Sequence, residues 1–328
     1  MAIHMFQQLI DTLKKSPKKI VFTEGTDARI LEASARLLSG TFLTPVLVGN
    51  PEEIQAAAEE AGFNIRGAEI IDPETYPEMD KMVDTMVELR KGKMTADECR
   101  AALKKSNYFG TMLVKMGYAD ALLGGATYST ADTVRPALQI IKTKPGNKIV
   151  SSCFILVRPS ATGDREVLAM GDCAINIEPT AEEMAECAVE CAHTARIFDI
   201  DPKVAMLSYS TKGSGKGENV DKVRTATELA KAAAPELDID GELQFDAAFS
   251  PVVAQTKCKG SPVAGQANVF IFPEIQSGNI GYKIAQRLGG FAAYGPILQG
   301  LNAPINDLSR GCNAQEVYSM AIITAALA

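Results

Sequence analysis

The segment ALLGGATYSTADTVRPALQII, residues 121–141, joins a short apolar run to a helical pattern through two glycines. The run at residues 121–123 has the continuous apolar character of a strand buried on both faces. Ser129 or Thr130 can cap the helix that is expected over residues 130–141. A buried strand that leads at once into a capped helix is typical of a βα unit. The segment therefore predicts an α/β fold with a largely parallel sheet.

The same alternation recurs along the rest of the chain. Further strand-like runs lie at residues 20–23, 45–48, 149–157, 204–209 and 269–272. Helical patterns lie between or after them, at residues 28–38, 52–61, 77–90, 181–198, 220–234, 282–288 and 314–327. Such alternation indicates βαβ units, whose ligands bind beyond the carboxyl ends of the strands. Residues 151–179 differ, because two apolar strands joined by a turn at 161–164 indicate an antiparallel insertion.

The length of the chain and one polar segment indicate two domains. At about 100–200 residues per domain, 328 residues correspond most naturally to two. The segment KTKPGNK, residues 142–148, is polar, contains a proline and a glycine, and separates a helical pattern from a strand. We therefore expect a domain boundary there.

Charge and hydropathy exclude several partners. The chain has 33 Lys and Arg against 40 Asp and Glu, a net charge of -7, and no block of like charges. A broad basic face for nucleic acid or an anionic membrane is therefore not expected. Residues 1–19 have no signal-peptide pattern, and no run of about 18 apolar residues is present to span a bilayer. Any anionic ligand must be bound by a few clustered cations.

The scarcity of histidine narrows the possible chemistry. His4 and His193 are the two histidines, so a His-rich zinc site and Ser/His/Asp catalysis are nearly excluded, and no metal is expected. None of the seven cysteines forms a C-x-x-C motif. An odd number of cysteines argues against a complete disulfide framework, and reduced thiols are typical of a cytoplasmic protein.

Two glycine-containing segments are candidate anion sites. Residues 124–135, GGATYSTADTVR, form a strand–glycine–helix junction whose N–H groups can bind an anion, and Arg135 follows one turn later. An ordinary capped helix with a surface arginine is the alternative. Residues 208–217, SYSTKGSGKG, fit neither the Walker A nor the G-x-G-x-x-G spacing. A ligand loop and a flexible, solvated connection both remain open for that segment.

Two further segments concentrate polar or basic residues. Residues 302–316, NAPINDLSRGCNAQE, crowd polar side chains into one loop, which is costly to order unless it serves a site. If Asn313 is the N-cap of the last helix, Glu316 occupies a capping-box position. Cys312 has no nearby histidine to activate it, and a buried structural thiol is expected. Lys283 and Arg287 are four residues apart, so they share a helix face that either binds an anion or is solvated.

The chain resembles the phosphate acetyltransferases, or phosphotransacetylases, of the short, single-activity type. The resemblance runs through essentially the whole chain and is carried by seven motifs in order, at residues 126–143, 203–217, 240–249, 260–273, 278–288, 293–301 and 304–313. It implies two α/β domains with largely parallel sheets and an interdomain cleft, as in isocitrate and isopropylmalate dehydrogenases. The C-terminal stretch is expected to return to the first domain. The expected domains are therefore residues 1–145 plus 293–328, and residues 146–292.

The resemblance also implies a reaction and the residues that perform it. The reaction transfers an acetyl group reversibly between acetyl-CoA and inorganic phosphate, giving acetyl phosphate and CoA, without a permanently bound cofactor, in a cytoplasmic homodimer. Ser309 and Arg310 match the pair that handles the acetyl group, and Glu316 matches the carboxylate that deprotonates the CoA thiol. Many family members have Asp at that last position. The resemblance links Arg90 and Arg135 to the CoA phosphates and matches Arg287 to an arginine needed for activity. The local patterns described above add Ser129, Thr130 and Lys283 as candidate substrate-binding residues.

Three alternatives remain at this stage. A phosphate butyryltransferase shares the fold and the chemistry but needs a roomier acyl pocket. A catalytically silent homologue binds an acyl-CoA or phosphate without reaction, although the intact Ser309–Arg310 pair argues against it. A decarboxylating nicotinamide dehydrogenase has a related architecture, but no dinucleotide fingerprint or metal-carboxylate cluster is recognisable here.

Overall fold

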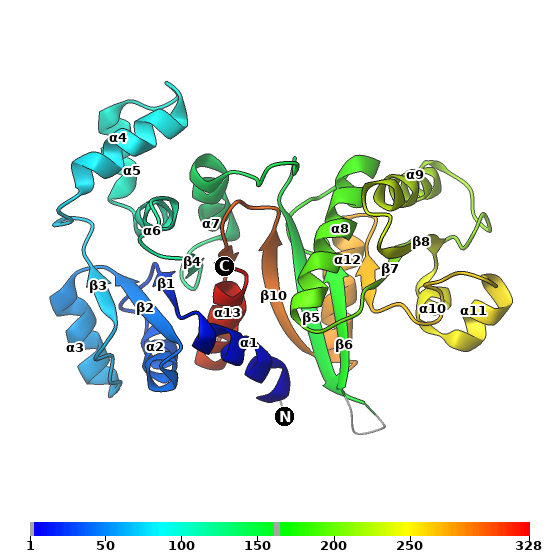
Figure 1. The fold of residues 1–328 in the computed structure, drawn as a ribbon, viewed down its shortest axis with the longest axis horizontal. Helices are drawn as coiled ribbons and strands as arrows, with labels where there is room; N and C mark the ends of the chain where they lie inside the picture. Colours follow the sequence, from blue (N-terminus) through cyan, green and yellow to red (C-terminus); the bar gives the residue numbers. More distant parts are fainter. Residues whose placement is uncertain (1–2, 161–164) are drawn as a thin grey trace. The chain divides into compact units, whose positions relative to one another are not determined.

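Two β-sheets organise the computed structural model, which describes residues 3–160 and 165–328 (Figure 1). One sheet belongs to a unit formed by Met1–Pro145 and Leu301–Ala328, and the other to a unit formed by Gly146–Gly300. The chain passes from the first unit to the second within the polar segment 142–148. The expected α/β class with largely parallel sheets is confirmed.

The sheet of the first unit is parallel throughout. Its strands are β1 (Lys18–Phe22), β2 (Leu43–Val48), β3 (Glu69–Ile71), β4 (Ala121–Gly124) and β11 (Ile305–Asp307). They lie in the order β11-β4-β1-β2-β3, and every neighbouring pair is parallel. After β1 the chain adds β2 and β3 on one side of β1, and it later adds β4 and β11 on the other side. The direction in which strands are added therefore reverses between β1 and β4. The loops after β1 and β4 therefore lie at the point where α/β sheets typically bind ligands.

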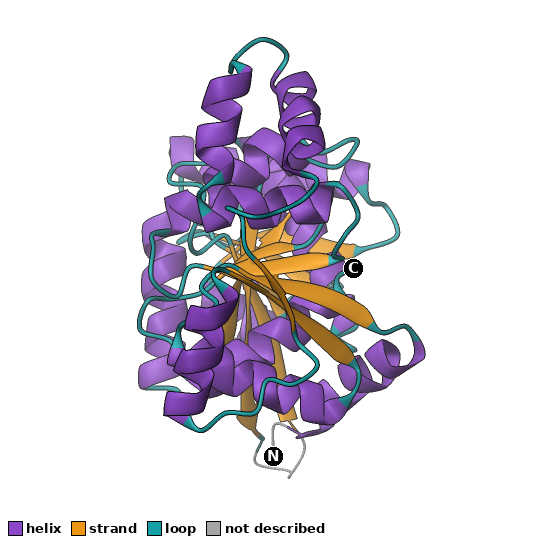
Figure 2. Ribbon diagram, turned by 90° about the vertical axis from the view of Figure 1, so that its left-hand side faces the viewer, coloured by secondary structure: helices purple, strands orange, loops and turns teal. Residues whose placement is uncertain are grey.

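Helices cover both faces of this sheet, as Figure 2 shows for the unit that faces the viewer. They are α1 (Ile3–Lys15), α2 (Ala28–Gly40), α3 (Pro51–Ala61), α4 (Met79–Arg90), α5 (Ala96–Leu103), α6 (Ser106–Lys115), α7 (Thr130–Pro136) and α13 (Ala314–Ala326). The π-helical turn η1 (Ala137–Ile141) continues α7. The C-terminal helix α13 packs against α1 and α2 and against β4.

The core of the first unit follows from its apolar strands. Ile20, Val21 and Phe22 of β1 have no exposed surface, as expected for a strand covered on both faces. Helices α4 and α6 contribute Met82, Met86 and Phe109 to the same core.

The sheet of the second unit is mixed. Its strands are β5 (Ser151–Pro159), β6 (Arg165–Gly171), β7 (Lys203–Leu207), β8 (Asp238–Leu243), β9 (Val269–Ile271) and β10 (Ala292–Gln299), in the order β10-β5-β6-β9-β7-β8. The pairs β10–β5 and β5–β6 are antiparallel, and the other three pairs are parallel. The expected antiparallel insertion is confirmed, whereas its turn at 161–164 lies outside the described residues.

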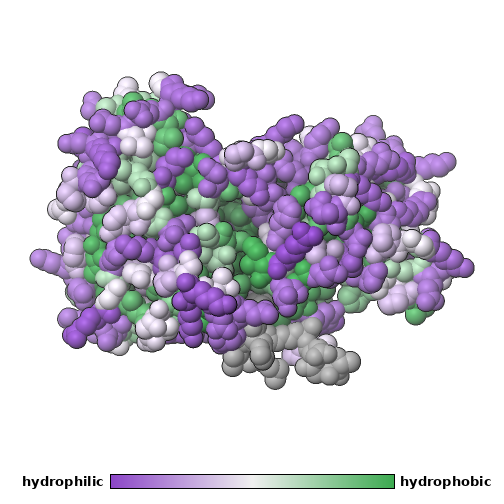
Figure 3. Space-filling model, in the orientation of Figure 1, coloured by the Kyte–Doolittle hydropathy of each residue, from purple (hydrophilic) through white to green (hydrophobic). Residues whose placement is uncertain are grey.

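The helices of the second unit are α8 (Ala181–Ile197), α9 (Glu218–Ala233), α10 (Phe245–Phe249), α11 (Pro251–Lys257) and α12 (Ile275–Arg287). Phe270 of β9 and Leu243 of β8 lie in the core of this unit. In the surface drawn in Figure 3, hydrophilic residues predominate, and apolar patches lie among them, some over α10 and α11. Among the described residues, no helix is both long enough and apolar enough to cross a bilayer.

Two boundaries differ from those expected. Residue 293, the expected start of the return to the first domain, lies inside β10, which pairs with β5; the chain re-enters the first unit at Leu301. Helix α12 begins at Ile275 rather than at residue 282, because Glu274 caps it by accepting hydrogen bonds from the N–H groups of Gln276 and Ser277. Gly278 is required in this first turn, since a Cβ there would meet the Asp172 carbonyl oxygen.

Candidate active site

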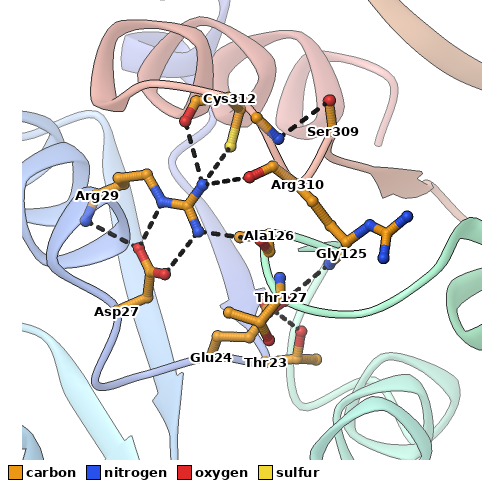
Figure 4. A network of polar contacts seen from close by, with 11 residues as sticks. Thr23, Glu24, Asp27, Arg29, Gly125, Ala126, Thr127, Ser309, Arg310 and Cys312 are labelled. Atoms are coloured by element: carbon orange, nitrogen blue, oxygen red, sulfur yellow. Dashed lines mark hydrogen bonds and ion pairs between the residues drawn. The ribbon is translucent and has the colours of Figure 1, made fainter.

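Ser309 and Arg310 lie on an exposed turn directly after β11. The Cys312 N–H donates to the Ser309 carbonyl oxygen at 2.9 Å, and the Gly311 N–H donates to the Ser309 Oγ at 3.3 Å. These bonds fix the turn and the serine hydroxyl. The Arg310 guanidinium makes no hydrogen bond or ion pair with the residues that the structure describes, and Figure 4 shows it directed away from the surrounding polar network. It is therefore available to an anion or a carbonyl oxygen.

Glu316 lies in the first turn of α13, and the expected capping box is confirmed. Its N–H donates to the Asn313 Oδ1 at 2.9 Å, while its Oε2 accepts from the Asn313 N–H at 3.0 Å. None of the described residues donates to the other carboxylate oxygen, Oε1. The cap therefore orients the side chain and leaves one oxygen available.

The N-terminus of α7 is joined to the end of β11 through a buried carboxylate. Ser129 is the N-cap, in a capping box with Asp132, so Thr130 is the first helical residue. The hydroxyls of Thr130 and Thr133 each donate to Asp307 at 2.6 Å. Burial raises the pKa of the Asp307 carboxyl, although the two hydroxyl donors oppose that shift. The structure thus brings Ser129 and Thr130 to the same sheet edge as Ser309.

Gly125, the residue directly after β4, has a packing role that the sequence does not reveal. Gly125 has a φ of +96°, and a Cβ on it would collide with the Asp307 Oδ1. The N–H groups of Gly125 and Thr127 both donate to Glu24 Oε1, at 3.0 and 3.1 Å. Because a protein carboxylate takes these donors, they are not the anion site expected at this junction.

Glu24 belongs to a polar network that sequence reasoning missed (Figure 4). It follows β1, and burial raises its pKa although hydrogen bonds from Thr23, Thr127 and Gly125 oppose the shift. Arg29, in the first turn of α2, donates to both carboxylate oxygens of Asp27, at 2.9 and 2.7 Å. A signal was present, since residues 24–29 directly follow a predicted buried strand, where α/β sheets bind ligands.

Two of the expected cations lie on or beside α7 and its continuation η1. Arg135 is exposed in the last turn of α7, and Arg90 ends α4. The Arg90 Nη1 lies 3.5 Å from the Gln139 carbonyl oxygen in η1, which continues α7. The Arg90 Nε is buried and has no partner among the described residues. Both guanidinium groups are therefore suited to an anion.

Lys283 and Arg287 lie in the second unit, exposed and one turn apart on α12, as their spacing predicts. The Lys283 Nζ donates to Asn279 Oδ1 at 2.9 Å. No hydrogen bond or ion pair of Arg287 occurs among the described residues, so its guanidinium is also available.

The loop at residues 208–217 closes around a carboxylate of its own unit. The Gly213 N–H and the Ser210 hydroxyl donate to Glu242 Oε1, at 2.6 and 3.0 Å, and the Gly215 N–H donates to the Ser210 Oγ at 2.8 Å. These donors are therefore occupied, which disfavours the interpretation as a ligand loop.

Cys312 is buried, as the sequence predicts, with 6% of its surface exposed. Burial raises the pKa of its thiol, although the nearby Arg29 opposes the shift. Within residues 3–160 and 165–328, no group of three or more His, Cys, Asp or Glu is arranged to hold a metal ion.

The fold and this site define an α/β protein with an exposed serine and arginine and a partly buried carboxylate beyond the carboxyl ends of parallel strands. The model of the phosphate acetyl/butaryl transferase family matches residues 4–325. The chain therefore belongs to this family.

Relatives and solved structures agree with that assignment. A phosphate acetyltransferase of Bacillus subtilis is 55% identical over 324 residues, covering 99% of each chain, and one of Staphylococcus epidermidis is 52% identical, covering 98% and 97%. A phosphotransacetylase structure from Streptococcus pyogenes aligns with a TM-score of 0.94 at 57% identity, over 98% of this chain and 97% of that one.

Proposed function

We propose that the chain is an enzyme that transfers an acetyl group reversibly between acetyl-CoA and inorganic phosphate, giving acetyl phosphate and CoA. Relatives at 50–55% identity over nearly the full chain carry the name phosphate acetyltransferase. The observation that carries the proposal is the exposed Ser309–Arg310 turn, whose guanidinium has no partner among the described residues. A phosphate butyryltransferase is not favoured by these names.

The proposed chemistry is a direct transfer. In the direction that makes acetyl-CoA, the CoA thiol gives its proton to Glu316 Oε1, and the sulfur attacks the carbonyl carbon of acetyl phosphate. The carbon–oxygen bond to phosphate then breaks, and inorganic phosphate leaves with the electron pair. A thiol with a pKa near ~8.5 is only slightly ionised at neutral pH, so a base accelerates the attack.

Arg310 and Ser309 act on the carbonyl in this proposal. Attack on an acyl carbon develops negative charge on its oxygen, and a preorganised cation or hydroxyl stabilises that charge. The guanidinium of Arg310 serves as the electrophile, and the Ser309 hydroxyl, oriented by the Gly311 N–H, is the second donor.

The phosphate groups of CoA and the transferred phosphate need cations. Arg90 and Arg135 are proposed for the CoA phosphates because guanidinium groups bind phosphate bidentately. Ser129, Thr130, Lys283 and Arg287 are proposed as further substrate-binding residues. In this scheme, activity requires no resident cofactor. The active form is proposed to be a homodimer in the cytoplasm. Light scattering on the purified protein measures its molar mass and so tests the dimer.

A coupled assay tests the proposal. CoA release from acetyl-CoA should depend on added phosphate, and it should fall strongly in Arg310→Ala but not in Arg100→Ala. Arg100 is a matched control because it is exposed on α5 and paired with Asp80. Butyryl-CoA should compete poorly. A chain without phosphate-dependent CoA release, or one that prefers butyryl-CoA, would contradict the proposal and favour a silent homologue or a butyryltransferase.

A further inference from the structure

We propose that Arg29 is a positioning residue, which fixes the Ser309–Arg310 turn without touching the substrate. The inference rests on the proposed role of Arg310. It concerns the network of Figure 4, in which Arg29 lies between the loop after β1, the loop after β4 and the loop after β11.

All five N–H donors of the Arg29 guanidinium are used within the protein. The Nε and Nη2 groups donate to the two oxygens of Asp27, and Nη2 donates also to the Ala126 carbonyl oxygen at 2.9 Å. Nη1 donates to the carbonyl oxygens of Arg310 and Cys312, at 2.9 and 3.1 Å. An arginine side chain has five N–H donors and no acceptor. Arg29 therefore has no donor left for a phosphate or carbonyl group.

The bonds of Nη1 act on the main chain of the proposed catalytic turn. The carbonyl groups of Arg310 and Cys312 flank Gly311, and both are held from one nitrogen. Gly311 meets few neighbours, since a Cβ there would lie 3.9 Å from the Ser309 Oγ. Arg29 is thus a long-range restraint on a turn that is otherwise held by its own short-range bonds.

Asp27 fixes the restraint in turn. It is the N-cap of α2 and accepts from the Arg29 N–H at 2.9 Å, so the carboxylate is anchored to the start of the helix. Burial raises the pKa of Asp27, but its hydrogen bonds with Arg29 outweigh burial and leave the pKa below the usual value. The pair therefore stays ionised at neutral pH, and the planar guanidinium keeps one orientation.

A lysine cannot replace this fork. A lysine ammonium group carries its three N–H donors on one nitrogen atom. The acceptors of Arg29 are the Asp27 carboxylate and three main-chain carbonyl oxygens, and they are reached from three different nitrogen atoms of the planar guanidinium. We expect Arg29→Lys to lower kcat about 100-fold, the loss typical of a misplacement of about 1 Å. The KM for acetyl-CoA should change little, because no substrate contact is removed.

A double-mutant cycle separates positioning from a general loss of structure. If Arg29 acts through the turn, Arg29→Lys should reduce kcat about 100-fold in the wild-type background but much less in Arg310→Ala, where only the contribution of Ser309 remains to be lost. A merely structural defect, or a direct substrate contact, would multiply with the loss in Arg310→Ala.

Arg36→Lys is the matched control. Arg36 lies on the same helix and reaches toward α13, where its Nη2 donates to Gln315 Oε1 at 2.6 Å and its guanidinium lies over the Tyr318 ring. Among the residues that the structure describes, Arg36 has no hydrogen bond or ion pair with the turn at residues 309–312. Its kcat should remain near that of the wild type.

The outcomes are distinguishable. Normal kcat in Arg310→Ala would overturn the proposed function, whereas normal kcat in Arg29→Lys together with a crippled Arg310→Ala would overturn only the positioning role. Multiplicative losses would also overturn it. If Arg29→Lys fails to fold, Asp27→Asn carries the same cycle. It keeps one acceptor oxygen and turns an amide group toward Nη2, and it should show a smaller loss of kcat that again shrinks in Arg310→Ala.

Discussion

The Thr130 hydroxyl donates to the Asp307 carboxylate at 2.6 Å, which joins the first residue of α7 to the last residue of β11. Because its hydrogen is used in this bond, the hydroxyl can bind a substrate only by accepting a hydrogen bond, so the proposed contact of Thr130 is with a substrate N–H or O–H group and not with a phosphate oxygen. The same carboxylate accepts from Thr133 and crowds Gly125, so it organises the sheet edge on which the proposed catalytic turn lies.

Removing this hydroxyl should weaken the first unit. We predict that Thr130→Val lowers the free energy of unfolding by about 1–3 kcal/mol, because it leaves a buried carboxylate with one donor fewer. Thr130→Ser keeps the hydroxyl and should lose much less. Urea denaturation of the two variants measures the difference, and equal stabilities would show that the bond contributes nothing.

Glu316→Gln separates the cap from the base. Gln preserves the capping box but cannot accept the thiol proton. We predict that kcat for acetyl-CoA formation falls about 10²–10⁴-fold at neutral pH, as expected for loss of a general base, with the melting temperature nearly unchanged. The loss should shrink as pH approaches the thiol pKa near ~8.5.

Glu98→Gln is the matched control for that prediction. Glu98 occupies the equivalent capping-box position with Thr95 at the start of α5. Its replacement changes a cap in the same way and should leave kcat unaltered. Near-normal turnover of Glu316→Gln would reduce Glu316 to a capping residue.

Arg135→Ala should weaken CoA binding. If Arg135 contacts a CoA phosphate, its loss removes a charge-assisted bidentate interaction of roughly 1.5–3 kcal/mol. We predict that the KM for CoA rises about tenfold or more while the KM for acetyl phosphate changes much less. Steady-state kinetics against each substrate measures this, and an unchanged KM for CoA would leave Arg135 as a surface residue on a capped helix.

Cys312→Ala should retain a substantial part of kcat. The thiol is buried, its pKa is raised, and the direct transfer proposed here requires no acyl-enzyme. Mass spectrometry of the wild-type protein quenched during turnover should detect no acetyl group on Cys312. A trapped acetyl group, or ping-pong kinetics, would contradict this prediction.

Asp240 should control the acid stability of the second unit. It is buried and accepts from Lys212, Lys231 and Ser261 at 2.6, 3.0 and 2.5 Å. Burial raises the pKa of Asp240, but these donors outweigh burial and hold it below its usual value. A lowered folded-state pKa stabilises the protein above the unfolded-state pKa of about 3.9, and the contribution is lost as pH falls through the folded value.

Asp240→Asn should therefore cost most stability near neutral pH, and the difference from the wild type should narrow as the solution becomes strongly acidic. Asp221→Asn is the control, because Asp221 is exposed and, among the described residues, its carboxylate pairs with Arg224 alone. Urea denaturation as a function of pH measures both variants. A difference that stays constant with pH would mean that the charge of Asp240 is not what stabilises the unit.

The elements that the sequence predicts best are those whose local pattern agrees with their environment. The apolar runs of β1 and β4 are buried, and the helices after them begin near the expected residues. β8 was not predicted, because its sequence, DIDGEL, carries four polar or flexible positions and resembles a loop. In the structure it pairs with β7, and its buried Asp240 is paired with Lys212, 28 residues earlier, and with Lys231, nine residues earlier. Tertiary contacts of this kind override local propensity.

The features of the site likewise fall into those that local sequence predicts and those that depend on distant residues. The capping boxes of Ser129 and Glu316 depend on residues three positions apart, so their spacing predicts them. The role of Arg29 depends on carbonyl groups up to 283 residues away, and main-chain acceptors carry no sequence signal. The position of Glu24 just after a buried strand was a signal, but its partners were not predictable, because they are main-chain N–H groups about a hundred residues later.

The return of the chain to the first unit at Leu301 fixes the order in which the protein can be completed on the ribosome. The second unit is one continuous segment, so it can fold as soon as its last strand has emerged. The first unit must wait, because β11 and α13 are synthesised after the whole of the second. Since domains fold as units while the polypeptide is being made, the Ser309–Arg310 turn forms only after the whole second unit has been synthesised. A nascent chain released early therefore lacks the proposed catalytic turn, and premature termination yields no partially active product.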